Sequence, residues 1–272
     1  QKNPELLKLG GETRNLSIMF TDIRGFTNIS EHYGKDVQGL TKIINRYMTA
    51  MTKQILANNG TLDKYIGDAQ MAFWNAPLDN NDHAKDAVKT ALEMMESLNE
   101  FNKEVVAEGI PAFGMGLGIN TDDVVVGNMG SDQRFDYTCL GDGVNTAARL
   151  EGQSKNYGVK ILLGPKTAEA VKDDYTILEL DNIAVKGKTQ GVQIYTVINS
   201  KEYETSKLHH EMMHAKYRGQ EFEAVIAFCE NLKNAFGGEM TTYYNMWIER
   251  CNDLMEQDLP KNWDGVFRAT SK

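Results

Sequence analysis

The sequence is poor in cysteine, lacks a long apolar run and holds fewer basic than acidic side chains. Its 3 cysteines are odd in number and have no CxxC spacing, which argues against a disulfide framework or a zinc ribbon and favours a reducing, cytoplasmic setting. No apolar run approaches the roughly 18 to 20 residues of a membrane-spanning helix, and no signal-peptide pattern stands near the start. The 29 Lys and Arg against 38 Asp and Glu leave a net charge of −9, so we expect no general attraction to nucleic acid or anionic lipid.

The rest of the composition is that of a soluble globular protein. The chain has 272 residues, of which 41% are hydrophobic and 25% charged, enough for a large core and a small appendage. It begins with Gln1 rather than Met, as a fragment of a longer protein would. Any membrane attachment is therefore expected only from an N-terminal region that this chain does not include.

Apolar periodicity predicts the elements of the first part of the chain. Residues 1–14 are polar, contain Pro4 and a Gly pair, and indicate an incoming linker. Residues 16–21 alternate as a strand that stops at Asp22. An apolar helix face follows over residues 40–55, and then two strand-like runs flank a tight turn at Gly67 and Asp68.

The order of elements predicts the fold class. A helix over residues 88–105, further strands and a helix from Val144 complete the order βααββαβ, followed by more strands. This order indicates an α+β fold, a mixed sheet with helices on one face. After about residue 200 only helical patterns remain, so we divide the chain into a linker (1–14), a globular domain (15–198) and a helical C-terminal extension (199–272).

Two aspartates stand at the ends of neighbouring predicted strands, Asp22 and Asp68. Two carboxylates about 4 Å apart near a surface repel by about 4 kcal/mol, so such a pair is stable only if it shares a proton or binds cations. Asp side chains without His or Cys nearby favour Mg²⁺ or Mn²⁺ over zinc. The simpler alternative is that each aspartate only caps a turn.

Three segments resemble the catalytic core of class III nucleotidyl cyclases in order and spacing: FTDIRGFT at 20–27, KYIGDAQMAF at 64–73 and YTCLGDGVNTAARLEG at 137–152. The resemblance covers about residues 14–198, and it implies the palm-like, ferredoxin-like fold of that family and makes residues 15–198 the catalytic domain. The helical extension and its WDGV sequence also resemble the C-terminal part of bacterial adenylate cyclases that carry an extracellular CHASE2 sensor.

The resemblance assigns metal and base-reading residues. It implies that Asp22 and Asp68, with the backbone carbonyl of Ile23, bind two Mg²⁺ or Mn²⁺ ions in each site. It places Lys64 and Thr138 at the purine edge. A lysine has only donors and so matches adenine N1, an acceptor, but not the N1–H of guanine, and Thr138 can accept from the adenine amino group. The implied activity is an adenylyl cyclase that converts ATP to cyclic AMP and pyrophosphate.

The same resemblance assigns the transition-state residues. Asn145 and Arg149 are four apart and share a helix face. In the family this pair orients the ribose and stabilises the charged α-phosphate, a role that suits a rigid guanidinium. Lys186, in IAVKGK, matches the family's triphosphate-binding lysine, and its simpler alternative is an ordinary turn lysine.

Family members share each active site between two catalytic domains, one supplying the metal aspartates and the other the purine and transition-state residues. This chain contains both sets, so we expect a head-to-tail homodimer with two equivalent sites and an inactive monomer. Residues 126–137 are expected at the dimer contact. Thr138 also places the chain in a subgroup that often responds to bicarbonate, which makes bicarbonate a possible effector.

Other functions remain as alternatives. A guanylyl cyclase would carry an acid in place of Lys64 and a small residue such as Cys in place of Thr138, and Cys139 is one position out of that register. A catalytically silent cyclase-like regulatory module usually loses metal or transition-state residues, and none is missing here. Residues 210–214, HEMMH, match the zinc-peptidase pattern HExxH without a second supporting motif.

Overall fold

The structure of the chain is a computed structural model with two compact units, Gln1–Glu151 and Gly152–Lys272. It describes residues 9–184, 191–200, 203–260 and 263–267. The predicted α+β class is confirmed, because strands and helices alternate in the first unit and helices alone close the second.

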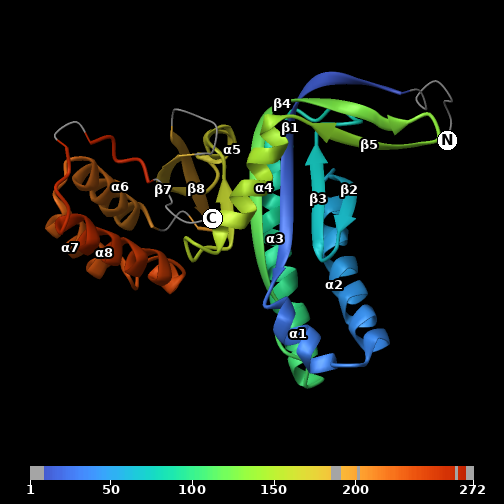
Figure 1. Cartoon of the computed structure of the whole chain (residues 1–272), viewed down its shortest axis with the longest axis horizontal. Helices are drawn as coiled ribbons and strands as arrows, with labels where there is room; N and C mark the ends of the chain where they lie inside the picture. The colour runs from blue at the N-terminus through green and yellow to red at the C-terminus, as the bar shows by residue number, and fades with distance from the viewer. Residues whose placement is uncertain (1–8, 185–190, 201–202, 261–262, 268–272) are drawn as a thin grey trace. The chain divides into compact units, whose positions relative to one another are not determined.

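Five strands form the sheet of the first unit (Figure 1). They are β1 (Gly10–Arg24), β2 (Thr61–Ile66), β3 (Ala69–Trp74), β4 (Gly114–Ser131) and β5 (Arg134–Leu140). The order is β2-β3-β1-β4, and β5 pairs with β4. All of these neighbours are antiparallel. In Figure 1, β5 and the adjoining half of β4 extend as a long hairpin beyond the helices.

Helices cover both faces of this sheet, whereas the sequence pattern suggested one. The helices are α1 (Phe26–Tyr33), α2 (Val37–Ala57), α3 (His83–Ala107) and α4 (Asp142–Ser154). Ser17 bonds His83 at the start of α3, whereas its neighbours Leu16 and Ile18 pack with Ala147 of α4. Since successive strand side chains point to opposite faces, α3 and α4 lie on opposite sides. The polar residues that alternate with apolar ones in this strand suggested one solvent-facing side. Ser17 is nevertheless buried, because its hydroxyl forms hydrogen bonds with His83 and Thr121.

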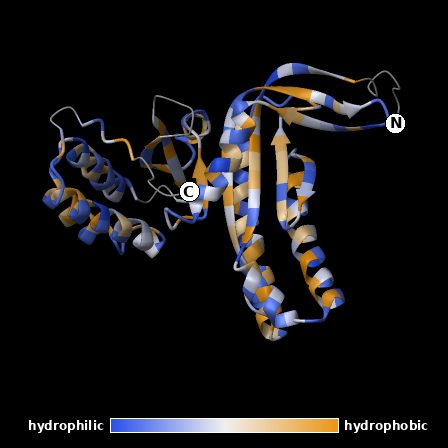
Figure 2. Ribbon diagram, in the orientation of Figure 1, coloured by the Kyte–Doolittle hydropathy of each residue, from blue (hydrophilic) through white to orange (hydrophobic). Residues whose placement is uncertain are grey.

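Strand β1 is longer than predicted at both ends. It pairs with β4 over its whole length, from Gly10 opposite Asn128 to Arg24 opposite Gly114. The residues from Gly10 onward therefore belong to the sheet rather than to a linker ending at residue 14. Asp22 likewise lies inside the strand, because ladder pairing continues past it, and not in a loop. Figure 2 shows hydrophobic residues gathered along the central strands of this unit.

The second unit combines a small sheet with the C-terminal helices. Its strands, β6 (Ile161–Leu163), β7 (Thr176–Ala184) and β8 (Gly191–Ile198), lie in the order β6-β8-β7. Its helices are α5 (Pro165–Val171), α6 (Glu204–Arg218), α7 (Phe222–Leu232), η2 (Phe236–Gly238) and α8 (Thr241–Met255). The division between the two units, after Glu151, differs from the predicted domain boundary at residue 198, and that boundary stays a prediction. No helix in the described ranges is long and apolar enough to cross a membrane.

Candidate active site

The structure brings the carboxylates of Asp22 and Asp68 together. Thr21 pairs with Gln70 across β1 and β3, so Asp22 lies beside the β2–β3 turn that carries Asp68. Gly67 makes this turn possible with φ of 65°, a left-handed conformation. Burial raises the pKa of Asp22, and the charge of Asp68 and a hydrogen bond to it raise that pKa further. The backbone N–H of Ile23 donates to Asp22 Oδ1 at 3.0 Å.

This donor set fits a hard divalent cation. Both side chains offer only oxygen, and their mutual repulsion would be relieved by a bound dication. Among the described residues no group of three or more His, Cys, Asp or Glu side chains gathers to hold a metal. A cation here would therefore rely on the two aspartates together with backbone, water or substrate oxygens.

Three further side chains lie near this pair, and the sequence analysis missed them. Burial raises the pKa of Glu151, from α4, to about 7, and the charge of Asp22 adds to this while Arg24 opposes it. Burial and then the charges of Asp22 and Asp68 raise the pKa of Tyr47, from α2, well above its usual range. Arg24 and Glu151 stand inside the segments that resemble the family, so those segments could have revealed them. Tyr47 lies on an apolar helix face, where a tyrosine is usually core.

The two predicted base-reading residues converge on one buried carboxylate. Thr138 Oγ1 donates to Asp63 Oδ2 at 2.5 Å, and Lys64 Nζ lies 3.5 Å from Asp63 Oδ1. The side chain of Asp63 is 0% exposed, whereas that of Lys64 is 41% exposed. Thr138 and Lys64 come from different strands, β5 and β2, and the carboxylate between them joins those strands. The sequence analysis did not single out Asp63.

Helix α4 holds Asn145 and Arg149 on its surface. A Cβ at Gly118 of β4 would lie 2.2 Å from the backbone nitrogen of Glu151, so glycine there lets α4 approach the sheet. The side-chain amide of Asn120 donates to the carbonyl of Gly143 at 3.0 Å and ties down the start of the helix. Both Asn145 and Arg149 are exposed, and within the described part of the chain the guanidinium of Arg149 forms no ion pair. Lys186 lies outside the described residues.

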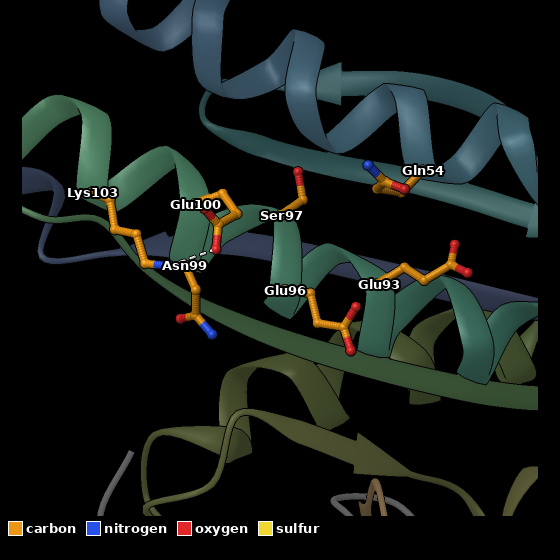
Figure 3. Close-up of a pocket in the computed structure, with 7 residues that line it drawn as sticks. All are labelled: Gln54, Glu93, Glu96, Ser97, Asn99, Glu100 and Lys103. Carbon is orange, nitrogen blue, oxygen red and sulfur yellow. Dashed lines mark hydrogen bonds and ion pairs between the residues drawn. The ribbon is translucent and has the colours of Figure 1, made fainter.

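An open pocket on the outer surface of α2 and α3 contains none of the predicted site residues (Figure 3). Gln54 reaches it from α2, and Glu93, Glu96 and Glu100 reach it from α3. Glu100 is paired with Lys103 at 2.7 Å. Three carboxylates against one lysine would repel a nucleotide triphosphate, so we do not assign substrate to this pocket.

The HEMMH match is structural, and the zinc-peptidase alternative is wrong. His210 Nε2 lies 2.6 Å from the carbonyl of Glu179 and must donate to it, so Nδ1 accepts from the hydroxyl of Tyr244 at 2.9 Å. His214 Nε2 bonds the hydroxyl of Tyr243 at 3.0 Å. Both imidazoles are buried, whereas Glu211 is exposed. His210 thus has no lone pair left for a metal.

An antiparallel sheet with paired aspartates beside its β2–β3 turn, covered by the arginine-bearing helix α4, has the architecture of a nucleotide cyclase catalytic domain. Residues 11–199 match the family described as the adenylate and guanylate cyclase catalytic domain, and the chain belongs to this family.

Several relatives carry cyclase names. The chain is 36% identical over 185 residues to Adenylate cyclase 1 of Rhizobium meliloti (strain 1021), covering 68% of this chain and 28% of that protein. It is 35% identical over 192 residues to Adenylate cyclase of Anabaena cylindrica, covering 68% of this chain and 37% of that one. The chain thus spans well under half the length of these curated relatives.

Solved structures of cyclase domains share the fold. The adenylyl cyclase CyaB from P. aeruginosa is 35% identical, with a TM-score of 0.65 over 71% of this chain and 98% of that one. The guanylyl cyclase Cya2 is 34% identical, with a TM-score of 0.64 over 72% of this chain and 98% of that one. Overall similarity therefore does not separate the two substrates, and individual side chains must.

Proposed function

We propose that this chain is an adenylyl cyclase, which converts ATP to 3′,5′-cyclic AMP and pyrophosphate by in-line attack of the ribose 3′-hydroxyl on the α-phosphate. The observation that carries the choice of ATP is the convergence of Lys64 and Thr138 on Asp63. Lys64 presents a donor that suits adenine N1, and Thr138 presents an acceptor that suits the 6-amino group. Guanine, with N1–H and O6 at these positions, would leave both contacts mismatched.

Asp22 and Asp68, with the carbonyl of Ile23, would hold two Mg²⁺ or Mn²⁺ ions. When bound, such ions lower the pKa of the attacking hydroxyl and neutralise the leaving pyrophosphate. Burial and then the charge of Asp68 raise the pKa of Asp22, and the repulsion between the two carboxylates supports this assignment, because a bound cation would relieve it.

Arg149 and Asn145 would act on the reacting groups from α4. The exposed guanidinium of Arg149 is available to stabilise charge that develops on the α-phosphate, while Asn145 orients the ribose. The close approach of α4 at Gly118 holds this helix at a defined distance from the sheet. Lys186 would bind the triphosphate.

We propose that each active site forms between two copies in a head-to-tail homodimer. The metal aspartates of one copy would face the base-reading and transition-state residues of the other, which gives two equivalent sites by two-fold symmetry. The β4–β5 hairpin supports this, because it extends from the sheet and exposes Val125 and Leu140, 42% and 58% accessible. Burial of these side chains against a partner would be favourable.

A guanylyl cyclase is the second candidate, since the guanylyl cyclase Cya2 resembles the chain nearly as well as the adenylyl cyclase CyaB. Purified protein incubated with Mn²⁺ and either ATP or GTP, with products separated by chromatography, decides between them. We expect cyclic AMP as the main product. Preferential cyclisation of GTP would contradict the base assignment, and no cyclisation of either nucleotide would support the silent regulatory module.

Setting and regulation are further proposals. Cys139, Cys229 and Cys251 are free and buried, which suits a reducing, cytoplasmic compartment. Bicarbonate is proposed as an effector, and titrating bicarbonate at fixed pH should raise turnover. An unchanged rate would remove bicarbonate from the account.

A further inference from the structure

The hydrogen bond between Thr138 and Asp63 fixes the direction in which the Thr138 hydroxyl donates its single proton. Thr138 is 8% exposed, and its Oγ1 lies 2.5 Å from Asp63 Oδ2. An ionised carboxylate has no proton to give, so Thr138 must be the donor in this bond. Its two lone pairs then remain for any group that approaches from outside.

A strand irregularity brings Asp63 to this position. The pairing of β2 with β3 shifts between Leu62 and Lys64, opposite Ala72 and Met71, so Asp63 is the extra residue of a bulge. A bulge re-aims side chains that regular alternation would place elsewhere. The side chain of Asp63 is fully buried, whereas the neighbouring side chain of Lys64 remains partly exposed.

The ammonium of Lys64 lies beside the carboxylate of Asp63 and favours its role as hydrogen-bond acceptor. Lys64 Nζ lies 3.5 Å from Asp63 Oδ1, and the Thr138 hydroxyl is on the other oxygen. Burial raises the pKa of Asp63, and the hydrogen bond from Thr138 and the charge of Lys64 oppose that rise. A buried hydroxyl held by a charge is therefore oriented, whereas a free hydroxyl could rotate to donate or accept.

We propose that Asp63 is a positioning residue for purine selectivity. By accepting the hydrogen bond of the Thr138 hydroxyl, it leaves Thr138 able only to accept from the base, which fits the amino group of adenine and rejects O6 of guanine. The proposal rests on the proposed adenylyl cyclase activity and adds a residue that does not itself touch the base. Without Asp63, the same hydroxyl could donate to O6, and discrimination would weaken.

The test compares the ratio of kcat/KM for ATP to kcat/KM for GTP. Asp63→Asn keeps the shape but offers an amide N–H, so Thr138 can accept from it and donate to the base. We expect the ratio to fall roughly tenfold, the size of one hydrogen bond that changes from matched to mismatched. Asp63→Ala, which removes the acceptor altogether, is the second variant should the first fail to fold. It should lower the ratio in the same direction.

A double-mutant cycle shows whether Asp63 acts through Thr138. Thr138→Val should lower the ratio, and adding Asp63→Asn to it should change the ratio no further, because the hydroxyl is already gone. Asp258→Asn, at an exposed aspartate outside the catalytic domain, is the control and should leave the ratio unchanged.

The outcomes separate the two proposals. A wild-type protein that prefers GTP, or cyclises neither nucleotide, overturns the proposed function. An ATP-selective wild type whose Asp63 variants lose kcat/KM equally for both nucleotides, with the ratio unchanged, overturns only the role of Asp63. An equal effect of Asp63→Asn in the presence and absence of the Thr138 hydroxyl does the same.

Discussion

Arg250 Nη1 lies 2.6 Å from Asp181 Oδ2, and this ion pair joins helix α8 to strand β7. Both side chains are nearly inaccessible, 9% and 1% exposed. Tyr157 donates to the same carboxylate oxygen at 2.6 Å, and the guanidinium lies 4.5 Å from the ring centre of Trp247. The last helix is thus held to the small sheet by a buried charge network, which makes it an integral part of its unit.

Removal of one partner from this network should strongly destabilise the second unit. Arg250→Ala leaves Asp181 buried without its countercharge, and we expect the free energy of unfolding to fall by about 3 to 5 kcal/mol. Urea denaturation followed by circular dichroism measures this. Arg218→Ala, which removes a half-exposed partner of Glu179, should cost less than about 1 kcal/mol. Equal effects of the two variants would contradict the buried network.

Loss of either proposed metal-binding aspartate should abolish turnover without unfolding the chain. Asp22→Ala or Asp68→Ala removes half of the carboxylate pair, and we expect the rate to fall by about a thousandfold or more. The repulsion between the two carboxylates also disappears, so the melting temperature should not fall. Asp258→Ala, an exposed aspartate near the end of the chain, serves as the control. Substantial activity in either metal-site variant would remove these residues from the site.

Two inactive variants should complement each other if sites are shared. Asp22→Ala and Arg149→Ala chains, mixed and allowed to exchange, form heterodimers that keep one intact site. Random pairing makes about half of the dimers mixed, so activity should recover to about a quarter of the wild-type rate. Gel filtration of each variant confirms that dimers form. No recovery from dimeric variants would argue for sites contained within one copy.

Stability should fall in mild acid because of His210. Burial lowers its pKa to about 4, against 6.5 for an ordinary histidine. Below pH 6.5 the unfolded chain therefore binds a proton that the folded chain refuses, and stability is lost as the pH falls toward 4, by up to about 3 kcal/mol. Urea midpoints between pH 8 and pH 5 measure the loss.

Two variants distinguish the contribution of the buried His210 to this pH dependence of stability from that of the exposed His209. His210→Gln should flatten the pH dependence, although buried His214 retains a share of it. His209→Gln, at the neighbouring exposed position, should leave the pH dependence as it is. A steep loss of stability in acid that persists in His210→Gln would show that another group causes it.

A methyl group at Gly118 should displace helix α4. The added Cβ would meet the backbone of Glu151 at 2.2 Å and that of Ala147 at 2.5 Å, neither of which can rotate away. We expect Gly118→Ala to cost about 1 to 3 kcal/mol of stability and to lower turnover, since Arg149 moves with the helix. Gly152→Ala, on α4 itself and with nothing within 4 Å, should instead stabilise the helix slightly. Equal melting temperatures for the two variants would contradict the close approach.

Local patterns were enough to single out most of the residues of the candidate site. The segments around Asp22, Asp68 and Thr138 are contiguous strings, and strand alternation with a turn at Gly67 is enough to place each aspartate near the end of a strand. The helix spacing of Asn145 and Arg149 likewise follows from sequence alone. These features depend on residues within a few positions of one another, where the backbone period decides which side chains share a face.

Other features needed the folded chain. The second covered face of the sheet was missed because the polar Ser17 is buried through bonds to His83 and Thr121, more than sixty residues away. The HEMMH pattern fits either a metal site or a structural pair, and the hydroxyls of Tyr244 and Tyr243, bonded to the imidazoles of His210 and His214, decide for the structural pair.

The amino-acid sequence by itself determined the family, most of the order of elements and the chemistry that the proposed metal, base and phosphate positions can offer. Only the tertiary structure decided which of these side chains are held by partners, as Asp63 and Thr138 are across 75 residues of chain. The physical reason is that such contacts depend on strand register, a bulge and the packing of distant elements, none of which leaves a periodic trace in the local sequence.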